Sequence, residues 1–153
     1  MDIDACREEA HDDWRDLYKP AITASPDTTV QEAAHRMRSR KVGALVVVNG
    51  TGTPVGILTD RDIAVKVVAQ GADPAATRVG TLITRKPTVI REDAGILDAT
   101  KLLSRRGIRR LPVVSKTGKL VGIIALDDLL MLLGSELGHI ASTLASELGR
   151  TRI

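Results

Sequence analysis

The sequence has almost no aromatic residues: its 153 residues include one tryptophan, one tyrosine and no phenylalanine. Proteins that bind RNA or single-stranded DNA commonly stack the bases on aromatic side chains. The net charge of +3 is also small for a dedicated nucleic-acid-binding protein. Only the basic clusters within residues 36–41 and 105–110 support nucleic-acid binding, so the sequence favours this function least.

Cysteine and long apolar stretches are scarce as well. Cys6 is the only cysteine, which excludes an internal disulfide framework. The chain has no uninterrupted run of about 18 apolar residues. Its start, MDIDACREEAHDD, is acidic and unlike a signal peptide. We therefore expect a cytoplasmic protein without a membrane partner.

Residue types that carry out catalysis occur only at scattered positions. The three histidines lie far apart, and the sequence contains no HExxH, CxxC or GxGxxG motif. Acidic residues at 60–62 and 127–128 stand at predicted helix starts, where the helix dipole favours them without any catalytic role. We expect neither an enzyme nor a metal site.

What the sequence does contain is an internal duplication. Residues 42–62 read VGALVVVNGTGTPVGILTDRD, and residues 108–128, which lie 66 positions later, read IRRLPVVSKTGKLVGIIALDD. The identical pairs are Leu45/Leu111, Val47/Val113, Val48/Val114, Thr51/Thr117, Gly52/Gly118, Val55/Val121, Gly56/Gly122, Ile57/Ile123 and Asp62/Asp128. One such unit is too small to bury its own apolar face, so two copies are predicted to pack as one pseudo-symmetric body. A cleft between the copies is the first place to look for function.

Each copy begins with the same two predicted elements. A short extended piece follows a Lys-Pro pair, at residues 21–24 and again at 88–91. A helix follows, with small or apolar residues at i, i+3, i+4 and i+7 from Val30 and from Ile96. Capping-box spacing marks both helix starts, at Thr29/Glu32 and at Gly95/Asp98.

Two strands joined by a tight turn come next in each copy. The apolar runs 44–48 and 55–58 flank the turn of the first copy, and 111–114 and 121–124 are their counterparts. A second helix then starts near Asp60 and near Leu126. The order strand, helix, strand, strand, helix predicts a mixed fold of the α/β (α+β) class.

The second copy ends in a longer helix, with the sequence LDDLLMLLGSELGHIASTLASELG. An apolar stripe follows it at alternating threes and fours, which is typical of a helix that packs along another helix. The stripe comprises Leu130, Leu133, Leu137, Ile140, Leu144 and Leu148. It either lies on the chain's own body or contacts a second copy, and we predict a homodimer that also buries residues 63–68.

The segment Gly56–Asp62, GILTDRD, resembles the CBS domain family, named after cystathionine β-synthase. Copies of that family end in a strand with glycine, then Thr or Ser, two residues, and an aspartate at a helix start. The segment LPVV at 111–114 is similar to the family's second-strand signature. The resemblance implies a tandem pair, or Bateman module, of two pseudo-twofold-related β-α-β-β-α repeats. It divides the chain into an N-terminal helical extension (1–16), repeat 1 (17–75), repeat 2 (76–133) and a C-terminal helix (134–153).

Clefts in that family often hold adenine nucleotides such as AMP, ATP, NAD or S-adenosylmethionine. The resemblance implies that Thr59 donates to a phosphate and Asp62 accepts from a ribose, in line with the anion affinity of helix starts. Thr59 and Asp62 also have capping-box spacing, so they could instead cap their own helix. The other candidate ligand-binding residues are Ile22, Thr23, Gly43, Ala44, Arg109, Arg110 and Asp128.

The second copy departs from the family pattern. Ala125 stands where the first copy has Thr59, so the hydroxyl donor is missing. Arg109 and Arg110 stand where the first copy has Gly43 and Ala44, and their guanidinium groups either meet a phosphate or are solvated surface charge. If the packing brings them near Thr59, one composite site contains the threonine and the arginines.

These features favour a stand-alone regulatory protein that binds an adenine nucleotide and reports it to an unknown protein partner or to its own dimer. The alternative is a protein-interaction module with a degenerate, unoccupied cleft. Ala125 and the lack of an aromatic residue to stack on adenine support that alternative.

Overall fold

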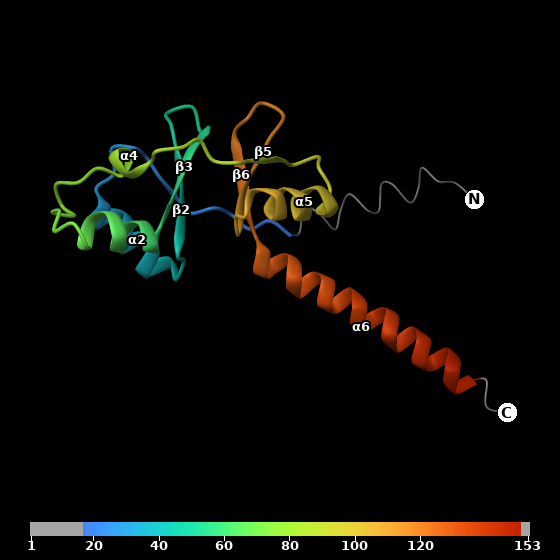
Figure 1. The fold of residues 1–153 in the computed structure, drawn as a ribbon. Helices are drawn as coiled ribbons and strands as arrows, with labels where there is room; N and C mark the ends of the chain where they lie inside the picture. The colour runs from blue at the N-terminus through green and yellow to red at the C-terminus, as the bar shows by residue number, and fades with distance from the viewer. Residues whose placement is uncertain (1–16, 151–153) are drawn as a thin grey trace.

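The computed structural model describes the backbone of residues 17–150 and the side chains of residues 17–147. This part of the chain forms two three-stranded sheets, ordered β1-β2-β3 and β4-β5-β6 (Figure 1). The strands are β1 Thr23–Ala24, β2 Ala44–Val48, β3 Pro54–Thr59, β4 Ile90–Arg91, β5 Arg110–Val114 and β6 Leu120–Ala125. The predicted mixed α and β fold of two like repeats is confirmed, whereas the extension predicted at 1–16 lies outside the described residues.

Helices follow the strands in the predicted order, except that the short helix α4, before β4, is an addition to that order. They are α2 Val30–Arg40, α3 Asp60–Ile63 continued by the π-helix η1 Ala64–Val68, α4 Val79–Leu82, α5 Ile96–Arg106 and α6 Leu126–Arg150. The capping box before α2 forms as predicted: Glu32 N donates to Thr29 Oγ1 at 3.2 Å, and Thr29 N donates to Glu32 Oε2 at 3.1 Å. Before α5 only half of a box is possible, because Gly95 has no side chain; Gly95 N donates to Asp98 Oδ2 at 3.5 Å.

The two hairpins have the same register. Ala44 pairs with Thr59 in the first copy, and Arg110 pairs with Ala125 in the second. Each hairpin also carries an irregularity at the same place, after Val47 and after Val113. The offset of 66 residues seen in the sequence is therefore preserved in the strand pairing.

Each repeat completes its core with a segment that lies outside its own strand-helix unit. Val79, Leu82 and Ile83, from the connection between the repeats, pack into the first core. Leu17 and Tyr18, from the start of the described chain, pack against the second core. Lys19 also forms an antiparallel bridge with Ile123 of β6. The segment at 79–83 therefore packs on the first repeat, and the segment at 17–19 packs on the second, so two separate segments join the repeats.

Helix α6 extends away from the two sheets (Figure 1). Its first turns reach the second core through Leu126 and Leu129. Beyond them, the described members of the predicted stripe, from Leu130 to Leu144, are between 40% and 66% exposed. The chain's own body therefore does not cover this stripe; the side chain of Leu148 lies outside the described residues.

Residues Leu126–Glu147 are long and apolar enough to cross a membrane by length and composition, and no other described helix passes that test. A single helix of this kind is only weak evidence for a membrane-spanning segment. The same segment meets the requirements of an amphipathic helix that pairs with another helix.

Candidate functional site

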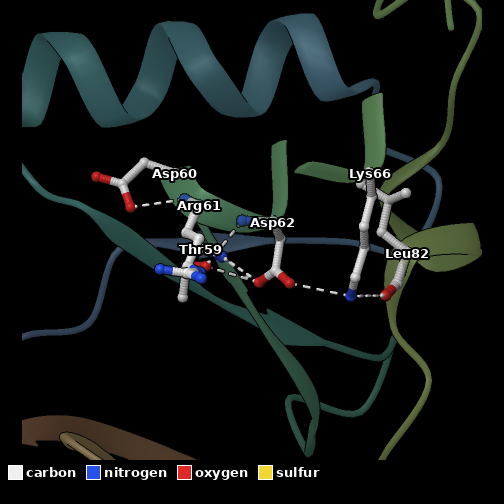
Figure 2. Close-up of polar contacts among 6 residues, drawn as sticks. All are labelled: Thr59, Asp60, Arg61, Asp62, Lys66 and Leu82. Atoms are coloured by element: carbon white, nitrogen blue, oxygen red, sulfur yellow. Dashed lines mark hydrogen bonds and ion pairs between the residues drawn. The ribbon is translucent and has the colours of Figure 1, made fainter. Parts of the chain in front are cut away.

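The junction between β3 and α3 is organised by Thr59 and Asp62. Asp62 N donates to Thr59 Oγ1 at 3.1 Å, while Thr59 N and Thr59 Oγ1 donate to Asp62 Oδ2 at 3.0 and 2.7 Å (Figure 2). This is the capping box that the spacing predicted as one of two interpretations. The only hydroxyl hydrogen of Thr59 is therefore already donated to Asp62.

Lys66 links this junction to the connection between the repeats. Its ammonium lies 2.9 Å from Asp62 Oδ1 and donates to the carbonyl oxygen of Leu82 at 3.1 Å (Figure 2). Partial burial raises the pKa of Asp62, but the hydrogen bonds from Thr59 and Lys66 outweigh it and hold that pKa below its ordinary value. Asp62 is thus a structural anion with both carboxylate oxygens engaged.

A cleft of about 520 Å³, called here the first cleft, lies beside Thr59. Its lining comes from the end of β3, the connection between the repeats, the end of α5 and the start of β5. The lining residues are Ile57, Thr59, Arg85, Lys86, Pro87, Thr88, Arg106, Ile108, Arg109 and Arg110. Five of the ten are cationic and none is acidic, so the first cleft is suited to an anion.

A second cleft of about 490 Å³ occupies the equivalent place in the other half of the molecule. It is lined by Lys19, Pro20, Ile22, Arg40, Lys41, Val42, Gly43, Ala44, Arg110, Ile123, Ala125 and Asp128. Several members are 66-residue counterparts of first-cleft residues, such as Ile123 for Ile57 and Ala125 for Thr59. Asp128 lies 2.5 Å from the ammonium of Lys19, so one of the four cations of the second cleft is paired.

The candidate residues from the sequence are divided between the two clefts. The first cleft contains Thr59, Arg109 and Arg110, so the packing does bring the threonine and both arginines into one site. The second cleft contains five candidates: Ile22, Gly43, Ala44, Arg110 and Asp128.

Two candidates lie outside the linings of both clefts. Asp62 is directed at Thr59 and Lys66 instead. Thr23 lies in β1, where its carbonyl oxygen accepts from Arg36 at 2.9 Å.

Three cationic residues of the first cleft were not among the predicted site residues. Arg85 and Lys86 lie between α4 and β4, in the part of the chain that the sequence assigns to the start of repeat 2. Arg106 belongs to the basic cluster within residues 105–110. The Lys-Pro pair at 86–87, which repeats the pair at 19–20, was the available signal.

A third cavity, of about 770 Å³, lies at the opposite, turn-bearing end of the sheets, beside Asn49, Thr53 and Gly118. Arg85 and Lys86, which it shares with the first cleft, supply its only charges. No group of three histidine, cysteine or acidic side chains that could hold a metal ion occurs within the described part of the chain.

The family model for the CBS domain matches the chain twice, over residues 14–69 and 79–135. The chain belongs to the CBS domain family. It is 43% identical over 107 residues to the CBS domain-containing protein YhcV of Bacillus subtilis, covering 70% of this chain and 74% of that protein. It is 39% identical over 114 residues to an uncharacterised protein of Methanopyrus kandleri, covering 74% of this chain but only 58% of that relative.

Solved structures of CBS pairs have the same fold. CBSX2 in complex with AMP matches with a TM-score of 0.67 and 29% identity, over 79% of this chain and 95% of CBSX2. The CBS domain pair of MJ0100, solved with 5′-methylthioadenosine and S-adenosyl-L-methionine, matches with a TM-score of 0.70 and 30% identity, over 80% and 95% of the two chains. A CBS domain protein of Pyrobaculum aerophilum in complex with AMP gives a TM-score of 0.69 and 25% identity, over 79% and 97%.

Proposed function

We propose that this CBS pair is a cytoplasmic regulatory module that binds an adenine nucleotide in the first cleft. The main support is the lining of that cleft, in which five cations and Thr59 surround about 520 Å³ between the two repeats. This volume lies in the range of about 300–1,000 Å³ typical of small-molecule sites. One guanidinium group can donate two parallel hydrogen bonds to the oxygens of a phosphate. Ile57, Pro87 and Ile108 offer aliphatic surface to a base. The AMP and S-adenosylmethionine complexes of structural neighbours add support.

Asp62 has a double role in this proposal. It orients the hydroxyl of Thr59. Because it lies outside the lining of the first cleft, it accepts from the ribose only if its side chain turns toward the cleft when a phosphate takes over the hydrogen bond from Thr59 Oγ1. Asp128 has no threonine beside it, because position 125 is alanine. We therefore expect Asp62→Ala to weaken nucleotide binding more than Asp128→Ala in calorimetric titrations. Equal losses, or a larger loss from Asp128→Ala, would show that the arginines of the second copy, rather than Thr59, organise the site.

Thermal unfolding with AMP, ATP, NAD and S-adenosylmethionine tests whether the cleft is occupied. A ligand present at about 100 times its dissociation constant adds about 2.7 kcal/mol of apparent stability. Arg106→Glu places a carboxylate in the first cleft, and Arg105→Glu makes the same charge change at an exposed neighbour outside both clefts. We expect Arg106→Glu to weaken binding by about tenfold or more, which is the loss of one charged hydrogen bond, and Arg105→Glu to have a much smaller effect.

The outcomes separate the proposal from its alternative. If none of the four nucleotides stabilises the wild-type protein, the alternative of an unoccupied cleft in an interaction module is favoured. If Arg105→Glu and Arg106→Glu weaken binding equally, the attraction is general surface electrostatics and the first cleft is not the site.

A nucleotide in the first cleft has a direct connection to α6. The amide of Leu126, the first residue of α6, donates to the carbonyl oxygen of Arg109 at 2.9 Å. A ligand that holds Arg109 thereby biases the position of the helix start, and the exposed helix carries the change outward. This connection makes α6 the output element of the proposed module.

Proline at position 126 tests the connection. Proline is tolerated at the first position of a helix, and Ala125 is already extended. Leu126→Pro therefore removes the amide that donates to Arg109, and Leu126→Ala removes the side chain but keeps the amide. We expect ligand-dependent changes in hydrogen exchange along α6 to persist in Leu126→Ala and to vanish in Leu126→Pro. If they persist in both variants, the signal does not pass through this bond.

We further propose that the exposed stripe of α6 pairs with α6 of a second copy. The stripe is narrow, and Ser135, His139 and Ser142 lie away from it, which suits a helix pair better than a helix surrounded by lipid. Light scattering should then give a mass near twice the 16.4 kDa of one chain. Leu137→Lys should give monomers, and Ser135→Lys, on the polar face, should not. A wild-type monomer at tens of micromolar would overturn the homodimer.

A further inference from the structure

Arg110 lines both clefts. It is the first residue of β5 and pairs with Ala125 at the end of β6. Its Nη2 atom lies 3.6 Å from the point that a Cβ on Gly43 would occupy, and Asp60 Oδ2 lies 3.1 Å from the same point. The guanidinium of a residue in the second repeat therefore ends beside the start of β2 in the first repeat.

The first repeat has no side chain equivalent to that of Arg110. The 66-residue counterpart of Arg110 is Ala44, which is buried and carries only a methyl group. The duplication thus produced two clefts, but only one guanidinium at this position serves both. Gly43, the counterpart of Arg109, leaves space for it.

From this arrangement we infer that the two clefts are negatively coupled through Arg110. A guanidinium that turns its paired N–H donors to an anion in one cleft is not available to the other cleft. The other cleft then lacks one of its cations, and its affinity for an anion falls. The inference rests on the proposed anion-binding role of the clefts and adds a rule for their occupancy: the first cleft fills first, and filling it weakens the second.

The order of filling follows from the two linings. The first cleft has five cations and no acid, whereas the second has four cations and the carboxylate of Asp128. Each cleft has one cation paired with a carboxylate, Arg109 with Asp127 in the first and Lys19 with Asp128 in the second. Among the described residues this leaves four other cations in the first cleft and three in the second, so the second cleft depends more strongly on Arg110. Losing a charged hydrogen bond corresponds to about a tenfold loss of affinity or more, so we expect a coupling factor of about ten.

Calorimetric titration of the full chain measures this factor with two probes, ATP and inorganic tripolyphosphate. The affinity of the second cleft is obtained from the weaker step in the wild type and again in Arg106→Glu, at ligand concentrations that leave its weakened first cleft largely empty. The ratio of the two affinities, Arg106→Glu over wild type, is the coupling factor. Arg105→Glu controls for the change in overall charge.

Removing Arg110 should abolish the coupling. Arg110→Gln keeps most of the side chain and loses the charge, so Arg106→Glu in that background should leave the second cleft's affinity unchanged. Arg109→Gln is the matched control, because Arg109 lines only the first cleft, and there the factor should remain near ten. If Arg110→Gln does not fold, Arg110→Lys replaces the planar donor pair by a single ammonium, and the factor must fall in that variant as well.

The outcomes distinguish this inference from the proposed function. A factor of one or less in the wild type, or a factor that survives in Arg110→Gln, overturns the coupling even if ATP binds. Coupled binding of tripolyphosphate without any binding of adenine nucleotides refutes the nucleotide proposal and supports the coupling. If tripolyphosphate binds to neither cleft, the inference is wrong.

Discussion

Replacing Gly56 by alanine should disrupt the packing that joins the connection between the repeats to the first core. A Cβ on Gly56 would lie 2.3 Å from Ile83 Cγ2, 2.9 Å from Ile83 Cδ1 and 3.0 Å from Ile83 Cγ1. Gly56 is buried in β3, so the clash cannot be relieved into solvent. Forcing an extra methyl into a packed core typically costs about 1–3 kcal/mol. We expect Gly56→Ala to lose stability in that range.

The structure identifies the atoms responsible, so the loss should be reversible. Ile83→Ala removes all three of the nearest atoms and, because Ile83 is only partly buried, should itself cost about 2 kcal/mol, at the low end for such truncations. In the double variant the new methyl of residue 56 enters the vacated space. The double variant should therefore be no less stable than Ile83→Ala alone, which corresponds to a coupling energy of about 1–3 kcal/mol.

Urea unfolding followed by circular dichroism measures the four proteins of this cycle. Gly50→Ala is the control, because a Cβ there meets nothing within 4 Å. Losses that simply add in the double variant would refute the packing argument. Since Ile83 lies two residues before Arg85, Gly56→Ala should also weaken anion binding in the first cleft, and Gly50→Ala should not.

Three further predictions concern local structure. Lys41 and its counterpart Gly107 end α2 and α5 in the left-handed region, with φ 54° and 60°. In urea unfolding, Lys41→Gly should raise the free energy of unfolding and Gly107→Ala should lower it, each by about 1 kcal/mol. Thr29→Ala should cost about 0.5–2 kcal/mol in the same assay through loss of the cap on α2. The lowered pKa of Asp62 stabilises the fold above pH about 4, and this contribution is lost as the pH falls through the lowered value; Asp62→Asn should therefore flatten the acid limb of a stability–pH profile, and an unchanged limb would contradict the assignment.

Local patterns were sufficient to predict most elements of the fold. The start of α2 at Val30 and of α5 at Ile96 matches the prediction, because caps and apolar periodicity are encoded within a few residues. The first strands are shorter than predicted, Thr23–Ala24 and Ile90–Arg91. Their register also differs by one residue from the spacing of the Lys-Pro pairs: Ala24 pairs with Val47 and Ile90 pairs with Val113, which restores the offset of 66.

Contacts between the repeats could not be predicted in the same way. Nothing in the local sequence indicates that Ile83 packs on Gly56 or that Tyr18 packs on Gly122, where a Cβ would lie 2.5 Å from Tyr18 Cδ2. In the sequence, the only sign of these close contacts is that both copies have glycine at the same position, Gly56 and Gly122. The sequence predicts a site shared by Thr59, Arg109 and Arg110 only if the packing of the repeats brings them together, as it does. Arg85 and Lys86 reach the same cleft because of the path that the chain takes between the repeats.

The two clefts have diverged at the positions where a ligand would contact them, while the framework around them has not. Hairpin register, the buried glycines and the position of the first strand are the same in both copies. Position 59/125 is threonine or alanine, and position 44/110 is alanine or arginine. A framework glycine substituted in one copy would disturb the packing in that copy, whereas a lining residue can change without affecting the fold. The two linings therefore differ in charge and in hydroxyl donors on a preserved framework, which agrees with the proposal that the first cleft binds an anion more strongly than the second.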